Sequence, residues 1–337
     1  MITSSPSRVS GAAVDEPVML QRNVSIDVLK LALAFMVVGL HVGLLQDFSP
    51  TLGYLTSNGL FRIAVPVFLI INGFYFYPVL QRNEARRWFG RALGLYLFWT
   101  AVYGLLWIPA LSPGLSGLAK AVHTLVFGYF HLWYLCGMIG AALLMLILQH
   151  RPPRTVMIVA ALLYCGGVAI QYAGNYHLFA HPLLDRVSNT NWTHRNFLFL
   201  AFPFFYVGFA IHRYQLHKRI AMPYLCWGAA AGLVLLLLES YWNYTNPRND
   251  GGYDNFASAI LICPLVFLIA CNVKLYSSNK RIALYSSGIF LVHIFVLRTL
   301  QPYIDVGMSA MTFVVLAISL AITAALIPLS RKVRFIL

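Results

Sequence analysis

Long apolar segments separated by short polar ones recur along the whole of this 337-residue chain. A helix of about 20 apolar residues is long enough to cross the hydrocarbon core of a bilayer. About ten segments meet that requirement. They are residues 24–44, 59–79, 93–111, 132–148, 155–172, 197–212, 222–242, 256–273, 283–300 and 308–328. The pattern predicts an all-α fold, a polytopic transmembrane helical bundle of about ten helices.

The polar segments divide the chain into one membrane domain and two tails. Residues 1–21 are rich in small and polar residues and predict a mobile cytoplasmic tail, followed by a membrane domain over 22–330. Residues 331–337 are expected to form a second, short cytoplasmic tail. Residues 113–130 are apolar but contain a proline, several glycines and Lys120, so we expect an interfacial or re-entrant segment there.

Composition and charge agree with a membrane protein. With 60% hydrophobic residues, 10% charged residues and a mean hydropathy of +0.73, the chain is too apolar for an ordinary soluble protein, in which about a quarter of residues are charged. The net charge is +14, and most Lys and Arg fall in alternate short polar segments. Basic residues are retained on the cytoplasmic side of a membrane, so both termini are expected in the cytoplasm. No compact basic face is indicated, so binding to nucleic acid is not expected.

The first predicted span carries three ionisable residues, Asp27, Lys30 and His41. Charged groups inside a bilayer are costly and usually face the bundle interior or a water-filled cavity. Lys30 and His41 are eleven residues apart, so they lie on one helical face about 16 Å apart along the axis, and Asp27 shares that face. The helix therefore predicts a polar stripe from Asp27 and Lys30 at the cytoplasmic end to His41 at the outer end.

For both His41 and Lys30, two interpretations stay open. His41 suits a general base that removes a proton from an attacking hydroxyl, or it is simply hydrogen-bonded at the membrane interface. Lys30 either takes part in the chemistry or extends to the cytoplasmic headgroups while paired with Asp27 one turn away.

Other polar residues occur at a similar outer depth and could line an outward-facing pocket. They are Arg62, His131, Glu239, His293 and Arg298. Each one alone is also typical of a helix-end anchor, although His293 lies near the middle of its span. The loop histidines His177, His181 and His194 show no metal-ligand spacing, so they are expected in solvent and no metal is predicted.

Arginines cluster before the third predicted span. Arg87 and Arg91 lie four residues apart, on one helical face, and Arg86 is adjacent. The planar arginine fork suits the phosphates of a cytoplasmic nucleotide-bearing donor. The alternative interpretation is that these residues only mark the cytoplasmic side of the membrane.

These segments resemble, in the same order, landmarks of the acyltransferase 3 family of bacterial integral membrane proteins. The resemblance is strongest to members that O-acetylate exopolysaccharides, lipopolysaccharides and related saccharides. The similar segments are residues 22–30 (RNVSIDVLK) followed by 40–41 (LH), 61–73 (FRIAVPVFLIING), 131–135 (HLWYL), 202–208 (FPFFYVG) and 286–293 (SSGIFLVH). Nearly the whole chain is covered.

The resemblance implies a function for several of these residues. Family members take an acyl group from cytoplasmic acyl-CoA and deliver it to a hydroxyl at or beyond the outer face of the membrane. Their first-span pattern of a basic residue, ten residues and a histidine matches Lys30 and His41, which implies His41 as the catalytic residue. Their Arg-x-x-Arg pattern is replaced here by Arg87-x-x-x-Arg91 with Arg86 adjacent.

We therefore predict a multi-pass O-acyltransferase of the bacterial inner membrane that moves an acetyl group to a sugar hydroxyl of an exopolysaccharide or another surface saccharide. Acetyl-CoA is the expected donor substrate, and no permanently bound cofactor is predicted. The expected partners are membrane lipid, a lipid-linked or polymeric saccharide acceptor and polysaccharide assembly machinery. The candidate residues are His41, Lys30 and Asp27 for catalysis, Arg86, Arg87 and Arg91 for the donor, and Arg62, His131, Trp133, His293 and Arg298 for the substrate.

Three alternatives stay open at this point. His41 is either a general base or a transient carrier of the acyl group. A transporter would use Asp27, Lys30, His41, Glu239 and Arg298 as a proton or anion path. A structural partner of a polysaccharide assembly complex would need these side chains only for stability.

Overall fold

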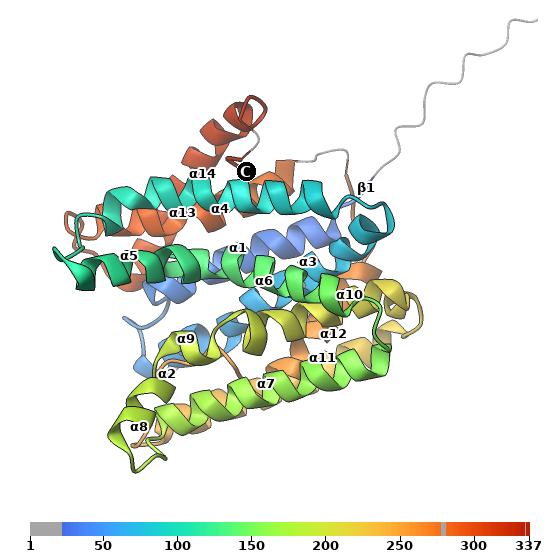
Figure 1. Cartoon of the computed structure of the whole chain (residues 1–337), viewed down its shortest axis with the longest axis horizontal. Coiled ribbons are helices and arrows are strands. Elements are labelled where there is room, and N and C mark those ends of the chain that lie inside the picture. Colours follow the sequence, from blue (N-terminus) through green and yellow to red (C-terminus); the bar gives the residue numbers. More distant parts are fainter. Residues whose placement is uncertain (1–21, 278–280, 334) are drawn as a thin grey trace, which may run out of the picture.

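The computed structural model describes residues 22–277, 281–333 and 335–337. The tail predicted at 1–21, and the basic residues Lys280 and Arg334, lie outside these described residues. Figure 1 shows long helices that run mostly side by side across the view. Apart from one pair of two-residue strands, all regular structure in the described chain is helical, which confirms the predicted all-α bundle.

The helices and strands follow one another along the chain, with short helical turns labelled η. They are β1 (Arg22–Asn23), α1 (Ser25–Val42), α2 (Pro50–Ser57), η1 (Leu60–Ile63), α3 (Ala64–Gln81), α4 (Ala85–Trp107), α5 (Leu115–Phe127), η2 (Phe130–Leu132), α6 (Trp133–Leu148), α7 (Pro153–Asn175), α8 (Pro182–Ser188), α9 (Asn191–His194), η3 (Phe197–Ala201), α10 (Phe202–Arg213), η4 (Leu216–Lys218), α11 (Met222–Thr245), α12 (Ala259–Asn272), β2 (Tyr276–Ser277), α13 (Arg281–Leu300) and α14 (Met308–Ser330).

Eight helical segments of the described chain are long and apolar enough to cross a membrane by length and composition. The other two predicted spans fall on shorter apolar helices, namely η3 with α10 and the 14-residue α12. Successive long helices alternate in direction, so the bundle has two ends. We call them the His41 end, where α1 stops, and the Lys30 end, where α1 begins.

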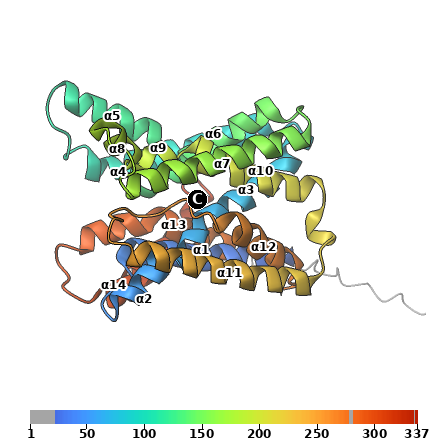
Figure 2. The same ribbon diagram turned by 90° about the horizontal axis from the view of Figure 1, so that it is seen from below.

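The centre of the bundle is built around α3 and α10, which make the most extensive contact between any two elements. Figure 2 shows α3 between a layer that contains α4, α6 and α7 and a second layer that contains α1, α11 and α12. Glycines permit the close approach. A Cβ at Gly73 would lie 1.8 Å from the Phe205 carbonyl oxygen, and one at Gly208 would lie 1.9 Å from the Ile70 carbonyl oxygen. Small residues at such contacts let helix backbones pack tightly within a membrane.

The segment predicted to be interfacial or re-entrant is a separate helix, α5, that precedes α6. Between them, Gly128 has φ +86° and Phe130–Leu132 form a 3-10 turn, so the two helices are not continuous. The Tyr96 hydroxyl of α4 donates a hydrogen bond to the Leu125 carbonyl oxygen at 2.7 Å, which holds α5 against the bundle. The break between α5 and α6 lies at the His41 end and contributes to the site described below.

Candidate active site

His41 lies in the last turn of α1. The helix ends two residues later because Gly43 adopts a left-handed conformation (φ +95°) and its N–H donates to the Gly39 carbonyl oxygen. Glycine reaches this conformation without the steric strain that a side chain would add. His41 is half-buried, so its imidazole is held at the edge of the bundle with one side open.

Two further histidines from distant helices pack beside His41. Its ring centroid is 5.4 Å from that of His293 in α13, and the His293 centroid is 4.9 Å from that of His131 in η2. His293 is fully buried and His131 is 2% exposed. These three residues, which we call the histidine cluster, were all candidates from the sequence, and the fold brings them together.

The hydrogen bonds of His293 determine where its proton lies. Its Nδ1 is 2.8 Å from the Phe290 carbonyl oxygen and 3.1 Å from the Ile289 carbonyl oxygen. Carbonyl oxygens only accept, so Nδ1 carries the hydrogen and Nε2 keeps a lone pair. Within the described chain, Nε2 of His293 and both ring nitrogens of His131 are buried without a hydrogen-bond partner. Unsatisfied buried groups of this kind are uncommon, and a water, an ion, a ligand or a role in chemistry accounts for many of them.

Two cavities meet at His41. The large cavity has a volume of about 540 Å³, and its walls include His41, Arg62, Trp133 and Arg195. The side cavity has a volume of about 400 Å³ and lies beside α13 and the start of α14, with Arg298 in its wall. His41 and Phe130 line both cavities.

Phe130 separates the two cavities and has an unusual backbone. Its φ is +48°, a left-handed conformation that bulky residues rarely adopt. Its ring centroid is 6.1 Å from that of His41, and the Arg298 guanidinium lies over the ring at 4.7 Å. Strained backbone is retained where the surrounding structure requires it, often at functional sites. The geometry places the Phe130 ring directly beside the histidine cluster.

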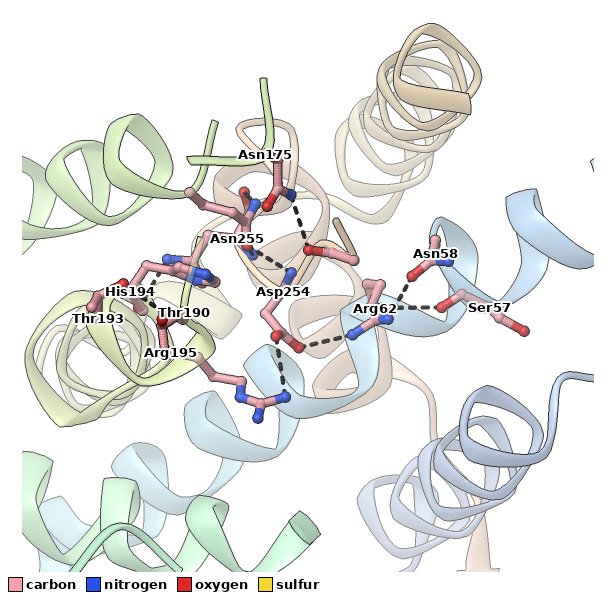
Figure 3. A network of polar contacts seen from close by, with 12 residues as sticks. Ser57, Asn58, Arg62, Asn175, Thr190, Thr193, His194, Arg195, Asp254 and Asn255 are labelled. Carbon is pink, nitrogen blue, oxygen red and sulfur yellow. Dashed lines mark hydrogen bonds and ion pairs between the residues drawn. The ribbon is translucent and has the colours of Figure 1, made fainter. Parts of the chain in front are cut away.

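An ion-pair network forms one wall of the large cavity. Nη1 of Arg62 is 2.8 Å from Oδ1 of Asp254, and Nη1 of Arg195 is 3.3 Å from Oδ2 of the same carboxylate. Figure 3 shows the two guanidinium groups approaching Asp254 from different elements. Arg195 also lies over the ring of Trp133 at 5.1 Å, a cation–π contact.

Asp254 is held in place by the loop that carries it. Oε1 of Gln171 accepts hydrogen bonds from the backbone N–H groups of Asp254 and Asn255 at 2.8 and 2.9 Å, and Nε2 of Gln171 donates to the Asn255 carbonyl oxygen. Burial alone would raise the pKa of the Asp254 carboxyl group. Arg195 and Arg62 outweigh that effect and lower its pKa below the usual value, so the carboxylate is ionised.

Two other polar residues of this end differ from the sequence-based expectation. Glu239 does not line the pocket, because its carboxylate accepts hydrogen bonds from Tyr172, from the Ala257 N–H and from both the N–H and the hydroxyl of Ser258. It fixes the start of α12 instead. His194 was expected in solvent but is 1% exposed, and burial lowers its pKa to about 4, so it is neutral at physiological pH.

At the Lys30 end, two smaller cavities lie side by side. The lysine cavity, about 180 Å³, is lined by Lys30, and the arginine cavity, about 330 Å³, is lined by Arg87 and Arg91. The two share Asn72, Leu95 and Met138 in their walls. Together they extend from the surface of this end toward the interior of the bundle.

Aromatic rings separate the lysine cavity from the histidine cluster. Phe290 lines that cavity, and its ring centroid is 5.2 Å from both Tyr134 and His131. Phe68 packs on the same ring at 5.9 Å. Aromatic side chains, and not backbone, therefore fill the space between the lysine cavity and the histidine cluster. Side chains can change rotamer.

Comparison with known proteins agrees with this architecture. The model of the acyltransferase 3 family, described as an acyltransferase domain, matches residues 23–329. The chain belongs to the acyltransferase 3 family. The match includes α1 to α13 and all but the last residue of α14.

Two curated relatives are more distant. An amino-acid racemase of Enterococcus faecalis is 24% identical over an alignment that covers 94% of this chain, and a serine/alanine racemase of Enterococcus gallinarum is 27% identical over 69% of it. The chain spans 47% and 35% of the length of these relatives, respectively. No solved structure matches the chain.

In the structure, the candidate residues from the sequence fall into separate groups. His41, Arg62 and Trp133 line the large cavity, His131 and His293 lie behind His41, and Arg298 lines the side cavity. Lys30 and Asp27 lie together at the other end of α1, with Nζ of Lys30 3.9 Å from Oδ1 of Asp27. They do not reach the histidine cluster.

The arginine cluster before α4 also made three arginines candidates for binding the donor. Arg87 and Arg91 line the arginine cavity, whereas Arg86 is exposed and is not part of its wall. No group of three or more His, Cys, Asp or Glu side chains that could hold a metal ion occurs among residues 22–277, 281–333 and 335–337.

Several residues of the large cavity and of the network beside it were not candidates from the sequence, among them His123, Trp192, Arg195 and Asp254. Arg195 was not among the candidate residues from the sequence. Its signal was its position: it is one of few basic residues predicted on the outer side, where retention in the cytoplasm does not explain a charge. Asp254 lies in a loop and Trp192 in the four-residue helix α9, where no periodic pattern indicates which side chains meet. His123 lies on α5, and only the packing of that helix brings it to this cavity.

Proposed function

We propose that this protein is an O-acyltransferase that moves an acetyl group from cytoplasmic acetyl-CoA to a hydroxyl of a surface saccharide, in the inner membrane of a bacterium. The observation that supports this proposal most is the placement of His41. It lines a cavity large enough for a sugar unit, and it packs against a buried histidine that retains a free lone pair.

The Lys30 end would bind the donor. Arg87 and Arg91 line a cavity beside an apolar passage past Asn72, so they would hold the phosphates of CoA while its pantetheine arm follows the lysine cavity inward. The acetyl thioester would then lie against Phe290. A change of rotamer there would open the way to His41, because Phe290 contacts the histidine cluster directly.

In the reaction, the acceptor oxygen would attack the thioester carbon, forming the ester C–O bond as the C–S bond breaks. As general base, His41 would take the hydroxyl proton and then return it to the departing CoA sulfur. Alternatively, a nitrogen of His41 would accept the acetyl group first and pass it to the acceptor in a second step. In both routes His293 would act as a positioning residue, since its unpartnered Nε2 can accept a hydrogen bond from a neighbouring imidazole.

The names of the two relatives add a second acceptor class. Both concern amino acids, and one names serine, which carries a hydroxyl group that can be acylated. L-Serine therefore belongs among the acceptors to be tested beside saccharides.

The transporter alternative has less support. Of the residues that it would use, Glu239 is fully engaged in fixing α12, and Arg298 is exposed beside the side cavity. It still predicts flux of a proton or anion without consumption of acetyl-CoA.

A transfer experiment tests the proposal. Membranes with wild-type protein or with His41→Ala at equal abundance receive isotope-labelled acetyl-CoA, with lipid-linked saccharides, soluble oligosaccharides or L-serine as acceptor. We expect base-labile label on an acceptor with wild type only. Equal labelling with both proteins would remove His41 from the mechanism, and proton or anion flux without labelling would favour the transporter.

A further inference from the structure

The charges around the large cavity do not balance. Its wall contains Arg62 and Arg195, and the one carboxylate that contacts them, Asp254, has both oxygens engaged. The side chains of Arg62, Arg195 and Asp254 are only 18%, 26% and 13% exposed, so solvent screens them less than it screens surface pairs. In the described part of the chain, no Asp or Glu lines this cavity. One positive charge is therefore left over.

The two arginines differ in the donors that they have left. Arg62 uses Nε on the Ser57 carbonyl oxygen, Nη1 on Asp254 and Nη2 on Asn58. Arg195 makes one long bond to Asp254 through Nη1, and its other N–H groups have no protein partner among the described residues. The spare charge and the spare donors thus belong to the same guanidinium group.

The position of Arg195 is fixed by its neighbours. Its guanidinium lies over the Trp133 ring, and the next residue, Asn196, accepts hydrogen bonds from the N–H groups of Leu198 and Phe199. This cap fixes the start of η3 directly after Arg195. A planar arginine fork with a fixed base binds a carboxylate or phosphate in two-point contacts.

The rest of the cavity suits a ring-shaped ligand. Trp192 packs on Phe127 at 5.8 Å between ring centroids, and His123 packs on both rings, so these three residues form an aromatic part of the cavity wall. Ligand sites commonly combine such aromatic walls with a few placed polar groups that fix orientation. His41 lies in the same cavity, so a ligand anchored at Arg195 would present other parts of itself to the histidine cluster.

We infer that the large cavity recognises an acceptor that carries an anionic group, a carboxylate or a phosphate, and that Arg195 binds this group while the acceptor hydroxyl faces His41. This inference rests on the proposed function for the identity of the ligand as an acceptor. A uronic acid, a sugar phosphate and an amino acid share the required chemistry. A neutral saccharide lacks it.

Binding without the donor tests the inference separately from acyl transfer. The full chain, in neutral-lipid nanodiscs without acetyl-CoA, is titrated with a glucuronate-containing disaccharide, its neutral glucose counterpart, glucose 1-phosphate and L-serine. We expect at least one anionic ligand to bind about tenfold or more tightly than the neutral disaccharide, as expected for a good charge-assisted contact. The ligands that bind show whether the site recognises a carboxylate or a phosphate, and whether a sugar or an amino acid carries it.

Substitutions assign the preference to Arg195. Arg195→Gln should abolish the preference for the anionic ligand, and Arg195→Lys should keep part of it, because charge remains without the planar fork. Arg248→Gln is the matched control, since it removes an exposed arginine of the same end that lies outside the cavity. Thermal unfolding of each variant excludes a folding defect.

Three outcomes would overturn the inference: equal binding of the neutral and anionic ligands, an unchanged preference in Arg195→Gln, or the same loss in Arg248→Gln. If the preference holds but no acceptor is acetylated when acetyl-CoA is added, the anion site stands and the proposed acyl transfer fails.

Discussion

The His41 end and the Lys30 end of the bundle both contain ionisable side chains, but these side chains differ in burial and in the number of their partners. At the His41 end, polar side chains are buried, come from several helices and hold one another in place, as the histidine cluster and the Arg62–Asp254–Arg195 network do. At the Lys30 end, Arg87 is 78% exposed and its contact in the described chain is with the neighbouring Glu84 at 3.6 Å. Long exposed side chains of this kind attract charge without fixing geometry.

The fixed setting of the histidine cluster suits chemistry, and the exposed arginines of the Lys30 end suit binding of a donor. Catalysis needs groups fixed within a fraction of an ångström, whereas binding of a phosphate needs only accessible positive charge. We therefore expect changes in the histidine cluster to lower kcat, and changes at the Lys30 end to raise KM for the donor.

The largest expected effect in this comparison, after loss of His41 itself, comes from His293. Because the His293 ring packs beside that of His41 and its Nε2 has no partner in the described chain, His293→Leu should lower kcat for acetyl transfer about 100-fold, the low end of what acid–base assistance supplies. The pH profile of kcat should shift as well, which a purely structural residue would not cause. A raised KM with unchanged kcat would contradict this assignment.

A substitution at the contact between α3 and α10, in the centre of the bundle, should destabilise the whole fold. Gly73→Ala places a methyl group against the Phe205 carbonyl oxygen, so we expect α3 and α10 to separate at a cost of about 1–3 kcal/mol in the free energy of unfolding. Thermal unfolding in detergent measures it. Gly90→Ala is the matched control, because nothing lies within 4 Å of the added Cβ, and its melting temperature should not fall. Equal melting temperatures for both variants would show that the close approach is not required.

Loss of donor phosphate contacts should have a moderate effect. Arg87→Gln combined with Arg91→Gln should raise KM for acetyl-CoA about tenfold with little change in kcat, because each charge-assisted contact at an exposed site contributes about 1 kcal/mol. Steady-state kinetics against acetyl-CoA measures this, with Arg151→Gln as a control that removes an exposed arginine of the same end. A fall in kcat without a change in KM would contradict a docking role.

The smallest effect concerns pH and stability at the His41 end. His177 contacts Asp185 at 2.7 Å and Asp250 at 2.9 Å, and these hydrogen bonds raise its pKa. A raised pKa in the folded state means that the stabilisation is complete below about pH 6.5, the ordinary value, and is lost as pH rises through the raised pKa. The melting-temperature difference between wild type and His177→Gln should therefore be small, largest in acid and absent in alkali. A difference that grew with pH would show that His177 acts in its neutral form.

Local periodicity explains what could be predicted. The position of each span, and the face shared by Lys30 and His41, follow from length and from the helical repeat, which depend only on neighbours in sequence. The end of α5 at Gly128 is also local, because a glycine acts on its own backbone, although the left-handed Phe130 carries no local signal.

The histidine cluster could be predicted only in part. Depth within the predicted spans placed His41, His131 and His293 at a similar level, but depth does not say which helices are neighbours. Only the packing of α13 and η2 against α1 made them one group.

By itself, the sequence determined that the chain forms an apolar helical bundle with a charged first helix, because hydrophobic length and helical period are local properties. The tertiary structure alone decided that Arg62 and Arg195 share Asp254, since these residues are 192 and 59 positions from that carboxylate. It also placed Glu239 and Arg86 outside the cavities for which the sequence had made them candidates. Which polar groups meet depends on how helices and loops pack over long sequence separations, where each buried charge must find a partner that no local pattern specifies.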